Sequence, residues 1–235
     1  MNNFTLCNID TDAIAFCKED MSSLTEDQRK ELIKSLNSQF DGGIEFSDDG
    51  YFPVFIVLKA KNYILYDGKK IKLKGSALKS ATLEPIFKQF LNEMIDALVF
   101  DKQDSMPEIY QKYVDMIDNI QDIRPWCKKL TISEKTLAGE RKNEKDILDC
   151  IQGKEYKPGD KIYVITRSKM VETGEYYKRT GVPKTKKVKY LCLREDFVGD
   201  YDKNTYYEKL YKCSQRFSTI LPTKELFTKF VDKNN

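Results

Sequence analysis

The chain has 235 residues, of which 40% are hydrophobic and 33% charged, and its formal net charge is +3. This length and composition describe a soluble globular chain with one large or two modest domains, and they exclude a chain disordered by composition. No apolar run approaches the roughly 20 residues that span a bilayer, and residues 1–10 lack the basic and apolar regions of a secretory signal. We therefore expect no membrane partner.

The six cysteines are scattered along the chain, and the sequence contains no histidine. No two cysteines form a Cys-x-x-Cys pair, which argues against a structural zinc site. Scattered single cysteines are typical of a reducing compartment, so we expect a cytoplasmic location. Without histidine, any catalysis would use carboxylates, lysines, tyrosines or a metal ion bound to oxygen atoms.

Charge is strongly segregated along the chain. Residues 1–50 contain 4 basic (Lys or Arg) and 11 acidic (Asp or Glu) residues, and residues 51–79 contain 7 basic and 1 acidic. Residues 80–123 contain 3 basic and 9 acidic residues, and residues 124–190 contain 18 basic and 9 acidic. An acidic start followed by basic blocks suits a protein that holds cations at one place and a polyanion at another. The alternative is that these runs are simply solvated faces.

The N-terminal part carries a hairpin signal and a helix signal. Residues 4–17 predict a strand, a tight turn near Asp10–Asp12 and a return strand, because apolar and β-branched residues surround a polar centre. Residues 25–40 predict a helix that begins with a capping box of Thr25 and Gln28.

A second strand region follows. Residues 51–66 are rich in aromatic and β-branched residues and predict a strand. Asp67-Gly68 predicts a type I′ hairpin turn into a return strand over 70–74. Because strand side chains alternate between faces, one face of this return strand is a row of lysines, namely Lys70, Lys72 and Lys74.

From residue 82 the apolar spacing becomes helical. The first predicted helix has Pro85 in its first turn, and the next is predicted to be capped by Ser105 with Glu108. Residues 124–137 are expected to continue from helix into a strand-like piece, and 155–169 to contain a strand. We expect a basic hairpin or loop over 171–190 and helices over 205–217 and 223–231. The change of period predicts an α+β fold with a boundary near residue 80: a partial antiparallel sheet, then a mainly helical part with a small β element.

Asp10, Thr11 and Asp12 form the first chemical motif. Carboxylates at positions i and i+2 of an extended segment point to the same side, roughly 7 Å apart at the backbone. Mg²⁺ prefers such oxygen ligands together with substrate phosphates, and a two-metal phosphoryl-transfer site needs such a pair. Acidic pairs are also common in turns, so the motif by itself favours a simple turn.

Lysines on the predicted strands form the second motif. Lys59 and Lys61 precede Tyr63, and the lysine row of residues 70–74 follows. Lysines on a rigid hairpin can contact the phosphates of a nucleic acid. The alternative is a soluble edge strand, because lysines also protect sheet edges from pairing.

In this order the motifs resemble those of family B DNA polymerases, particularly the viral and phage enzymes. NIDTDA is similar to the family's third palm motif, usually Tyr-Gly-Asp-Thr-Asp-Ser, and LTEDQRKELIKSLNSQF resembles the helix after it. GYFPVFIVLKAKNYILY resembles the strand of the family's Lys-Lys-Arg-Tyr element, and KKIKLKGSALKS resembles the passage into the thumb. The resemblance is collinear from residue 5 to about residue 137, and it implies that 1–80 form the C-terminal part of the palm and 81–235 the thumb.

The resemblance implies roles for individual residues. Asp12 matches the catalytic aspartate that ligates both metal ions, and Asp10 matches its acidic companion, with Thr11 between them in the metal-binding turn. Lys61 and Tyr63 match residues that grip the primer end. The implied cofactor is a pair of Mg²⁺ ions, with Mn²⁺ as a substitute.

Gly75 and the lysines before it match the duplex-contacting lead into the thumb. Elsewhere the sequence departs from the family pattern. Asn8, Ile9 and Ala13 replace Tyr, Gly and Ser, and Ala60 and Asn62 replace the first lysine and the arginine. The metal-binding aspartates are kept while their surroundings and the primer grip differ.

In the family, the exonuclease domain, the first palm motif and the fingers lie upstream of the third motif, and here Met1 stands only a few residues before it. We therefore expect a split DNA-directed DNA polymerase. Its partners would be primer-template DNA, dNTP and an N-terminal chain that supplies the exonuclease, the fingers and the rest of the palm. The chain would be active only with that partner, and in the host cytoplasm if it is viral.

Two other hypotheses stay open. One is a catalytically inactive DNA-binding remnant of such a polymerase. The other is a standalone Mg²⁺ phosphohydrolase built on Asp10 and Asp12, which fits poorly because the sequence has no third carboxylate cluster and no phosphate-cradling glycine loop.

Overall fold

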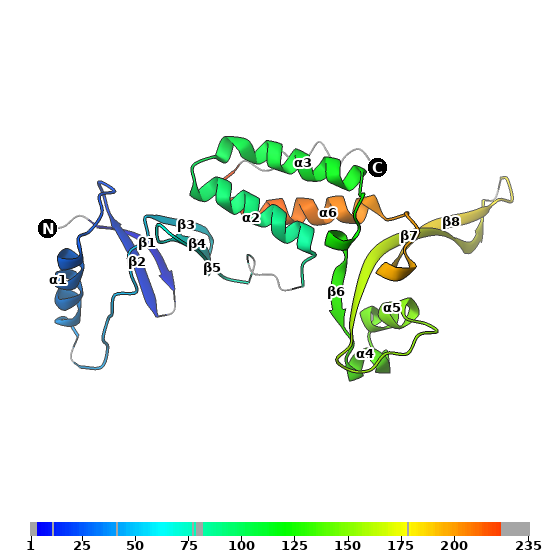
Figure 1. The fold of residues 1–235 in the computed structure, drawn as a ribbon, viewed down its shortest axis with the longest axis horizontal. Helices are drawn as coiled ribbons and strands as arrows, with labels where there is room; N and C mark the ends of the chain where they lie inside the picture. The colour runs from blue at the N-terminus through cyan, green and yellow to red at the C-terminus, as the bar shows by residue number, and fades with distance from the viewer. Residues whose placement is uncertain are drawn as a thin grey trace. The chain divides into compact units, whose positions relative to one another are not determined.

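The computed structural model describes residues 4–10, 12–40, 42–76, 78, 82–177 and 179–221. Thr11 and the helix expected over 223–231 therefore lie outside the described residues. The chain divides into two compact units, residues 1–79 and 80–235, beside the boundary expected near residue 80. The predicted α+β class is confirmed, because helices accompany three small antiparallel sheets (Figure 1).

The first unit begins with the predicted hairpin. Strands β1 (Phe4–Asp10) and β2 (Ala13–Lys18) pair antiparallel, with Asp10 opposite Ala13. Helix α1 (Glu26–Asn37) follows, and its capping box is confirmed. The Thr25 hydroxyl accepts from the Gln28 N–H at 3.3 Å, and the Gln28 side chain accepts from the Thr25 N–H at 3.1 Å.

The rest of this unit is a three-stranded meander of β3 (Val54–Lys59), β4 (Asn62–Tyr66) and β5 (Ile71–Lys74). The prediction of a single strand over 51–66 was wrong, because the chain reverses between Lys59 and Asn62, which pair with each other. Lys61 lies in that turn with φ +60°, a left-handed conformation that ends an extended strand.

The turn from β4 to β5 also differs from the prediction. A type I′ turn centred on Asp67 and Gly68 needs positive φ at both residues, but Gly68 has φ +89° and Asp67 does not have positive φ. The Asp67 carboxylate accepts hydrogen bonds from the N–H groups of Lys69 and Lys70, at 2.9 Å and 2.7 Å. These two bonds hold the turn in a form that the dipeptide alone did not predict.

The second unit has a helical core of α2 (Pro85–Val99), α3 (Met106–Asp118) and α6 (Lys203–Ser214), which lie side by side (Figure 1). Their inner faces carry the buried aromatic side chains of Phe87, Phe90, Tyr113 and Tyr206, and Trp126 from the turn after α3 packs its ring against Phe87 and Tyr206. Burial of large aromatic side chains supplies much of the stabilisation of such a core.

The cap predicted for α3 was wrong. Ser105 does stand at the N-cap position, but its side chain makes no capping bond and its hydroxyl donates to the Lys102 carbonyl at 2.8 Å. The reason is the 3-10 turn η1 (Gln103–Ser105), which leads directly into the helix and holds Ser105 in helical geometry. An N-cap residue normally needs extended backbone to reach back to the helix.

The second sheet orders β6 (Lys128–Thr131), β7 (Lys161–Tyr176) and β8 (Pro183–Leu193), all antiparallel. Helices α4 (Glu134–Ala138) and α5 (Lys142–Cys150) connect β6 to β7. A small apolar core joins these elements, built from Ile132, Ile151, Ile162, Val164 and Leu193.

Three further 3-10 turns complete the unit: η2 (Arg124–Trp126), η3 (Arg194–Asp196) and η4 (Gln215–Phe217). The basic stretch expected as a hairpin or loop over 171–190 forms the outer part of the β7–β8 ribbon. In the described part of the chain, no helix combines the length and apolarity that crossing a membrane requires.

Candidate catalytic carboxylates and nucleic-acid interface

The two candidate aspartates lie at the tip of the first hairpin. Asp10 is the last residue of β1 and is half-buried, whereas Asp12 lies in the turn before β2 and is exposed. The hairpin forms because apolar and β-branched residues on both sides favour extended backbone. It presents the two carboxylates on one short turn, as the sequence predicts.

Tyr63 connects this turn to the meander. Its hydroxyl donates to Asp10 Oδ2 at 3.4 Å, and its ring stacks on Phe55 with the centroids 5.3 Å apart. Tyr63 is only 8% exposed, because β4 is the central strand of the meander. The structure therefore brings together two residues that the sequence analysis selected separately.

The environment of Tyr63 is negative. Burial raises the pKa of the Tyr63 hydroxyl, and the nearby charges of Asp10, Asp12 and Asp49 raise it further. A tyrosine hydroxyl is protonated at neutral pH, so this one donates its hydrogen bond to Asp10. It can hold the Asp10 carboxylate in one orientation.

Sequence reasoning missed Asp49. This residue is outside every regular element, in the segment that leads from α1 to β3. Its neighbour Asp48 is engaged locally, accepting from the Gly50 N–H at 2.8 Å and facing Arg29 at 3.5 Å. The adjacent pair Asp48-Asp49 before a strand was a visible signal, but nothing local connected it with Tyr63.

The lysine row shares a sheet face with Tyr63. Lys74 pairs directly with Tyr63, and Lys72 pairs with Leu65 two residues further along β4. Residues that pair across strands project to the same face. The side chains of Lys72 and Lys74 are exposed, while Ile71 and Leu73 are half-buried, which confirms the predicted alternation.

The other candidate lysines lie elsewhere on the meander. Lys70 stands just before β5, Lys59 ends β3, and Lys61 lies in the β3–β4 turn and not on a strand. Lys72 also faces Asp67 at 3.5 Å and stands over the Phe52 ring, with Nζ 5.2 Å from the ring centroid. The candidate lysines therefore lie on β3, on β5 and in the turns beside these strands.

Gly75 has a structural reason to be glycine. Its φ is +96°, and a Cβ atom there would collide with the Lys61 carbonyl oxygen and the Asn62 side chain. The close approach packs the end of β5 against the β3–β4 turn. Gly75 thus fixes the position of Lys61 relative to Lys74.

The donor chemistry at the hairpin tip fits a divalent cation. Asp10 and Asp12 supply carboxylate oxygens, the ligands that Mg²⁺ prefers. Among the described residues, no group of three or more His, Cys, Asp or Glu side chains is arranged to hold a metal ion.

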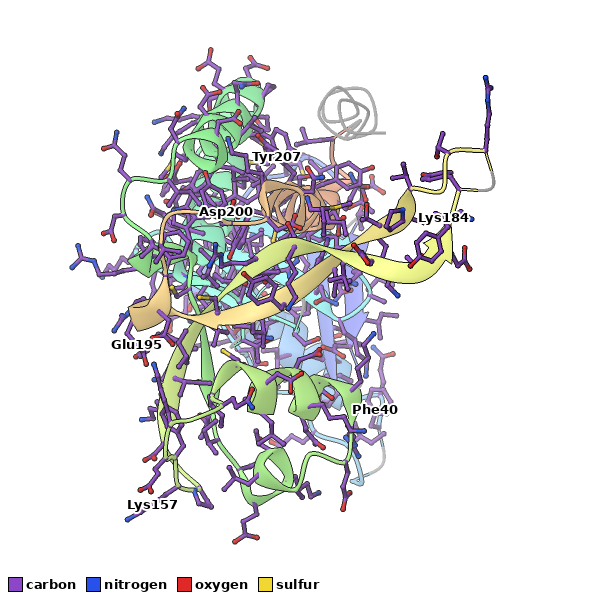
Figure 2. The ribbon with its side chains drawn as sticks, turned by 90° about the vertical axis from the view of Figure 1, so that its right-hand side faces the viewer. Phe40, Lys157, Lys184, Glu195, Asp200 and Tyr207 are labelled. Atoms are coloured by element: carbon purple, nitrogen blue, oxygen red, sulfur yellow. The ribbon has the colours of Figure 1, made fainter. Side chains whose placement is uncertain are left out.

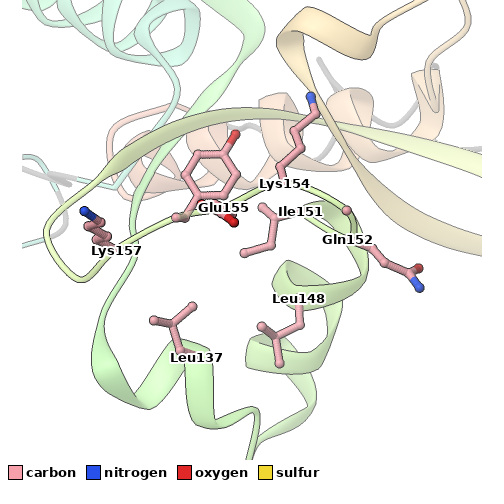
Figure 3. Close-up of a pocket in the computed structure, with 9 residues that line it drawn as sticks. Leu137, Leu148, Ile151, Gln152, Lys154, Glu155 and Lys157 are labelled. Carbon is pink, nitrogen blue, oxygen red and sulfur yellow. The ribbon is translucent and has the colours of Figure 1, made fainter.

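A hollow of about 440 Å³ lies in the second unit, beside α4 and α5 (Figure 3). Leu137, Leu148 and Ile151 point into it, so its floor is aliphatic. Lys154 at its edge is engaged with Asp196 at 2.8 Å. The hollow is an open edge of the small apolar core. Its lining residues include no pair of catalytic groups.

No protein-family model matches this chain, and no curated protein matches it. The assignment of a function therefore rests on the site itself and on the order of the motifs.

Proposed function

We propose that this chain is the C-terminal part of a family B DNA polymerase, and that it contributes the Asp10–Asp12 turn and the thumb to a split enzyme. The observation that carries the proposal is the hydrogen bond from Tyr63 to Asp10. The resemblance assigns these residues to primer grip and metal binding, and residues 53 positions apart need not meet unless the fold brings them together.

The reaction would be nucleotidyl transfer directed by primer-template DNA. The primer 3′-oxygen loses its proton and bonds to the α-phosphorus of a dNTP, while the bond from that phosphorus to the leaving pyrophosphate breaks. Asp12 and Asp10 would hold Mg²⁺ at this point, and the bound ions would supply positive charge to the phosphate oxygens. Tyr63 would orient Asp10 and stand close to the primer end.

The exposed lysines of the meander support a nucleic-acid contact. Lys72 and Lys74 lie on the face of the sheet that carries Tyr63, so phosphates bound by them would run past the carboxylate turn. Such contacts carry no sequence information and weaken steeply as salt is raised.

Features of the first hairpin support the need for a partner chain. It is a two-stranded sheet whose apolar side chains Leu6, Ile9 and Ile14 are 55%, 65% and 49% exposed. A lone two-stranded hairpin is marginally stable in water. Strands of an N-terminal chain that carries the remaining palm, the fingers and the exonuclease would cover these side chains and supply the missing aspartate.

A second candidate function is a DNA-binding remnant that has lost its chemistry. The replacement of the family's first lysine and arginine by Ala60 and Asn62 favours this reading. In this case the lysines would still bind DNA, and Asp12 would have no effect on any reaction.

Primer extension separates the two functions. The chain would be assayed alone and after co-expression with a candidate N-terminal chain, with Mg²⁺ or Mn²⁺ and dNTPs. We expect primer extension only when both chains are present. The Asp12→Asn variant should lose this extension and keep the duplex affinity of the unmodified chain. The matched control is Glu31→Gln, which removes an exposed carboxylate from α1.

Extension that survives Asp12→Asn would overturn the proposed role of the turn. No extension in any mixture, together with duplex binding that depends on Lys72 and Lys74, would support the remnant.

A further inference from the structure

The β7–β8 ribbon of the second unit extends well beyond the core that it starts from. Its first residues Ile162, Val164 and Ile165 are buried, but from Lys169 onward β7 is mostly exposed. We call the outer part, from Arg167 to Lys189 with the intervening turn, the arm; residue 178 within it lies outside the described residues. Figures 1 and 2 show the arm projecting away from the helices, with Lys184 near its end.

The arm is strongly basic. Between Arg167 and Lys189 the sequence contains eight Lys or Arg residues and two Asp or Glu residues. Like charges on a narrow two-stranded ribbon repel one another, so the arm carries an electrostatic cost that a polyanionic ligand would remove.

At the base of the arm the cations already have partners. Arg167 faces Asp200 at 3.6 Å, and Lys189 faces Glu208 at 3.5 Å. Lys187 faces Asp202 at 3.5 Å, and Asp202 is the buried residue that caps α6. These pairs fix the base of the arm against α6.

Three other cations of the arm are not neutralised. Within the described residues, Lys169, Arg179 and Lys186 are exposed and have no carboxylate within ion-pair distance. Nearer the turn, Lys184 has a carboxylate partner, Glu175 at 3.0 Å. Lys169, Arg179 and Lys186 are thus the cations of the arm that are available to an anion.

Aromatic side chains alternate with these cations. Tyr176 and Tyr177 at the end of the arm are 60% and 56% exposed. Lys184 Nζ lies 5.8 Å from the centroid of the Tyr177 ring, and nearer the base Lys169 Nζ lies 5.4 Å from that of Tyr190. Lysines alone could simply keep a ribbon soluble, but exposed tyrosines at its end work against that purpose.

We propose that the arm binds single-stranded nucleic acid. Lys169, Lys186 and Arg179 would contact successive phosphates, and the exposed ring of Tyr176 would stack on an unpaired base. Proteins that bind single strands without sequence preference combine a basic track with aromatic platforms in this way. A duplex would contact the lysines through its phosphates, but its bases are already stacked on one another and offer no free face to the tyrosine rings.

The inference rests on the arm alone and does not need the polymerase proposal. It is tested with the full chain and two labelled probes, an oligothymidylate of about 20 nucleotides and a duplex of the same length, by fluorescence anisotropy. The arm variant is Lys169→Glu with Lys186→Glu. The control is Lys135→Glu with Lys145→Glu, which makes the same charge change on exposed positions of α4 and α5.

We expect the arm variant to lose at least about tenfold in oligothymidylate affinity and to have a shallower salt dependence, while the control keeps most of its affinity. Tyr176→Ala should weaken oligothymidylate binding by about tenfold and leave duplex binding unchanged. All of the substituted side chains are exposed, so circular dichroism and the melting temperature should stay those of the unmodified chain.

Equal losses in the arm variant and the control would overturn the inference, as would tighter binding of the duplex with no effect of Tyr176→Ala. The same holds if the arm is required for binding to phosphatidylserine vesicles and not to either oligonucleotide. Because neither probe measures extension, a failure of the arm and a failure of the polymerase proposal are seen separately.

Discussion

The Tyr63 hydroxyl donates a hydrogen bond to Asp10 Oδ2 at 3.4 Å. This contact joins the central strand of the meander to the end of β1, and it places a phenol beside the turn that holds Asp12. The orientation of the carboxylate therefore depends on a strand that is distant in sequence.

Replacement of Tyr63 by Phe should destabilise the first unit by about 0.5–1.5 kcal/mol, because one hydrogen bond is lost and the packing on Phe55 is kept. If the proposed function holds, extension by the assembled enzyme should also fall several-fold, since Asp10 is no longer oriented. Chemical denaturation and primer extension measure the two effects. Tyr51→Phe, at a position 44% exposed, is the matched control and should change neither.

Gly75→Ala should destabilise the first unit by about 1–3 kcal/mol or more. The added methyl group collides with the Lys61 carbonyl oxygen, and alanine is strained at φ +96°. Gly68→Ala is the control, because it has a similar φ of +89° but nothing within 4 Å of the new methyl group. Equal losses of stability in the two variants would show that the close approach at Gly75 is unimportant.

The contact between Glu84 and Lys209 should stabilise the folded second unit. The Glu84 side chain is 3% exposed and Lys209 contacts it directly, so Lys209→Met would leave a buried carboxylate without its cation. We expect a loss of about 3–5 kcal/mol in the free energy of unfolding, measured by urea denaturation. The double variant Glu84→Gln with Lys209→Met should recover most of it, and a double variant as unstable as the single one would contradict this account.

Glu93 should make the second unit sensitive to acid. Burial acts to raise the pKa of Glu93, but hydrogen bonds from Lys112, Tyr113 and Gln89 outweigh it and hold the pKa below its usual value. A carboxyl group with a lowered pKa in the folded state contributes stability above its unfolded pKa, and this is lost as pH falls through the folded value.

The melting temperatures of the unmodified chain and of Glu93→Gln should therefore differ most near neutral pH and converge below roughly pH 4. The control is Asp96→Asn, an exposed position on the same helix. Its melting temperature should match that of the unmodified chain at neutral pH as well as in acid. A difference that stays constant from neutral to acid pH would mean that Glu93 acts through packing and not through its charge.

Local signals predicted much of the fold. The hairpin around Asp10 and the capping box of Thr25 both follow from residues that are close neighbours in sequence. The place of Pro85 in the first turn of α2 was likewise predicted, because proline there costs no hydrogen bond. The cap predicted for Ser105 failed because its hydroxyl donates to the Lys102 carbonyl instead. The spacing of Ser105 and Glu108 does not reveal that competing partner.

The sequence by itself determined the α+β class, the hairpin that carries Asp10 and Asp12, and the alternation that exposes Lys72 and Lys74, because period and turn chemistry are local properties. Only the tertiary structure decided that Tyr63 meets Asp10, that Asp49 adds its charge there, and that Gly75 packs against the turn at Lys61. These contacts join segments that are distant in the chain, and their geometry depends on how the whole unit packs.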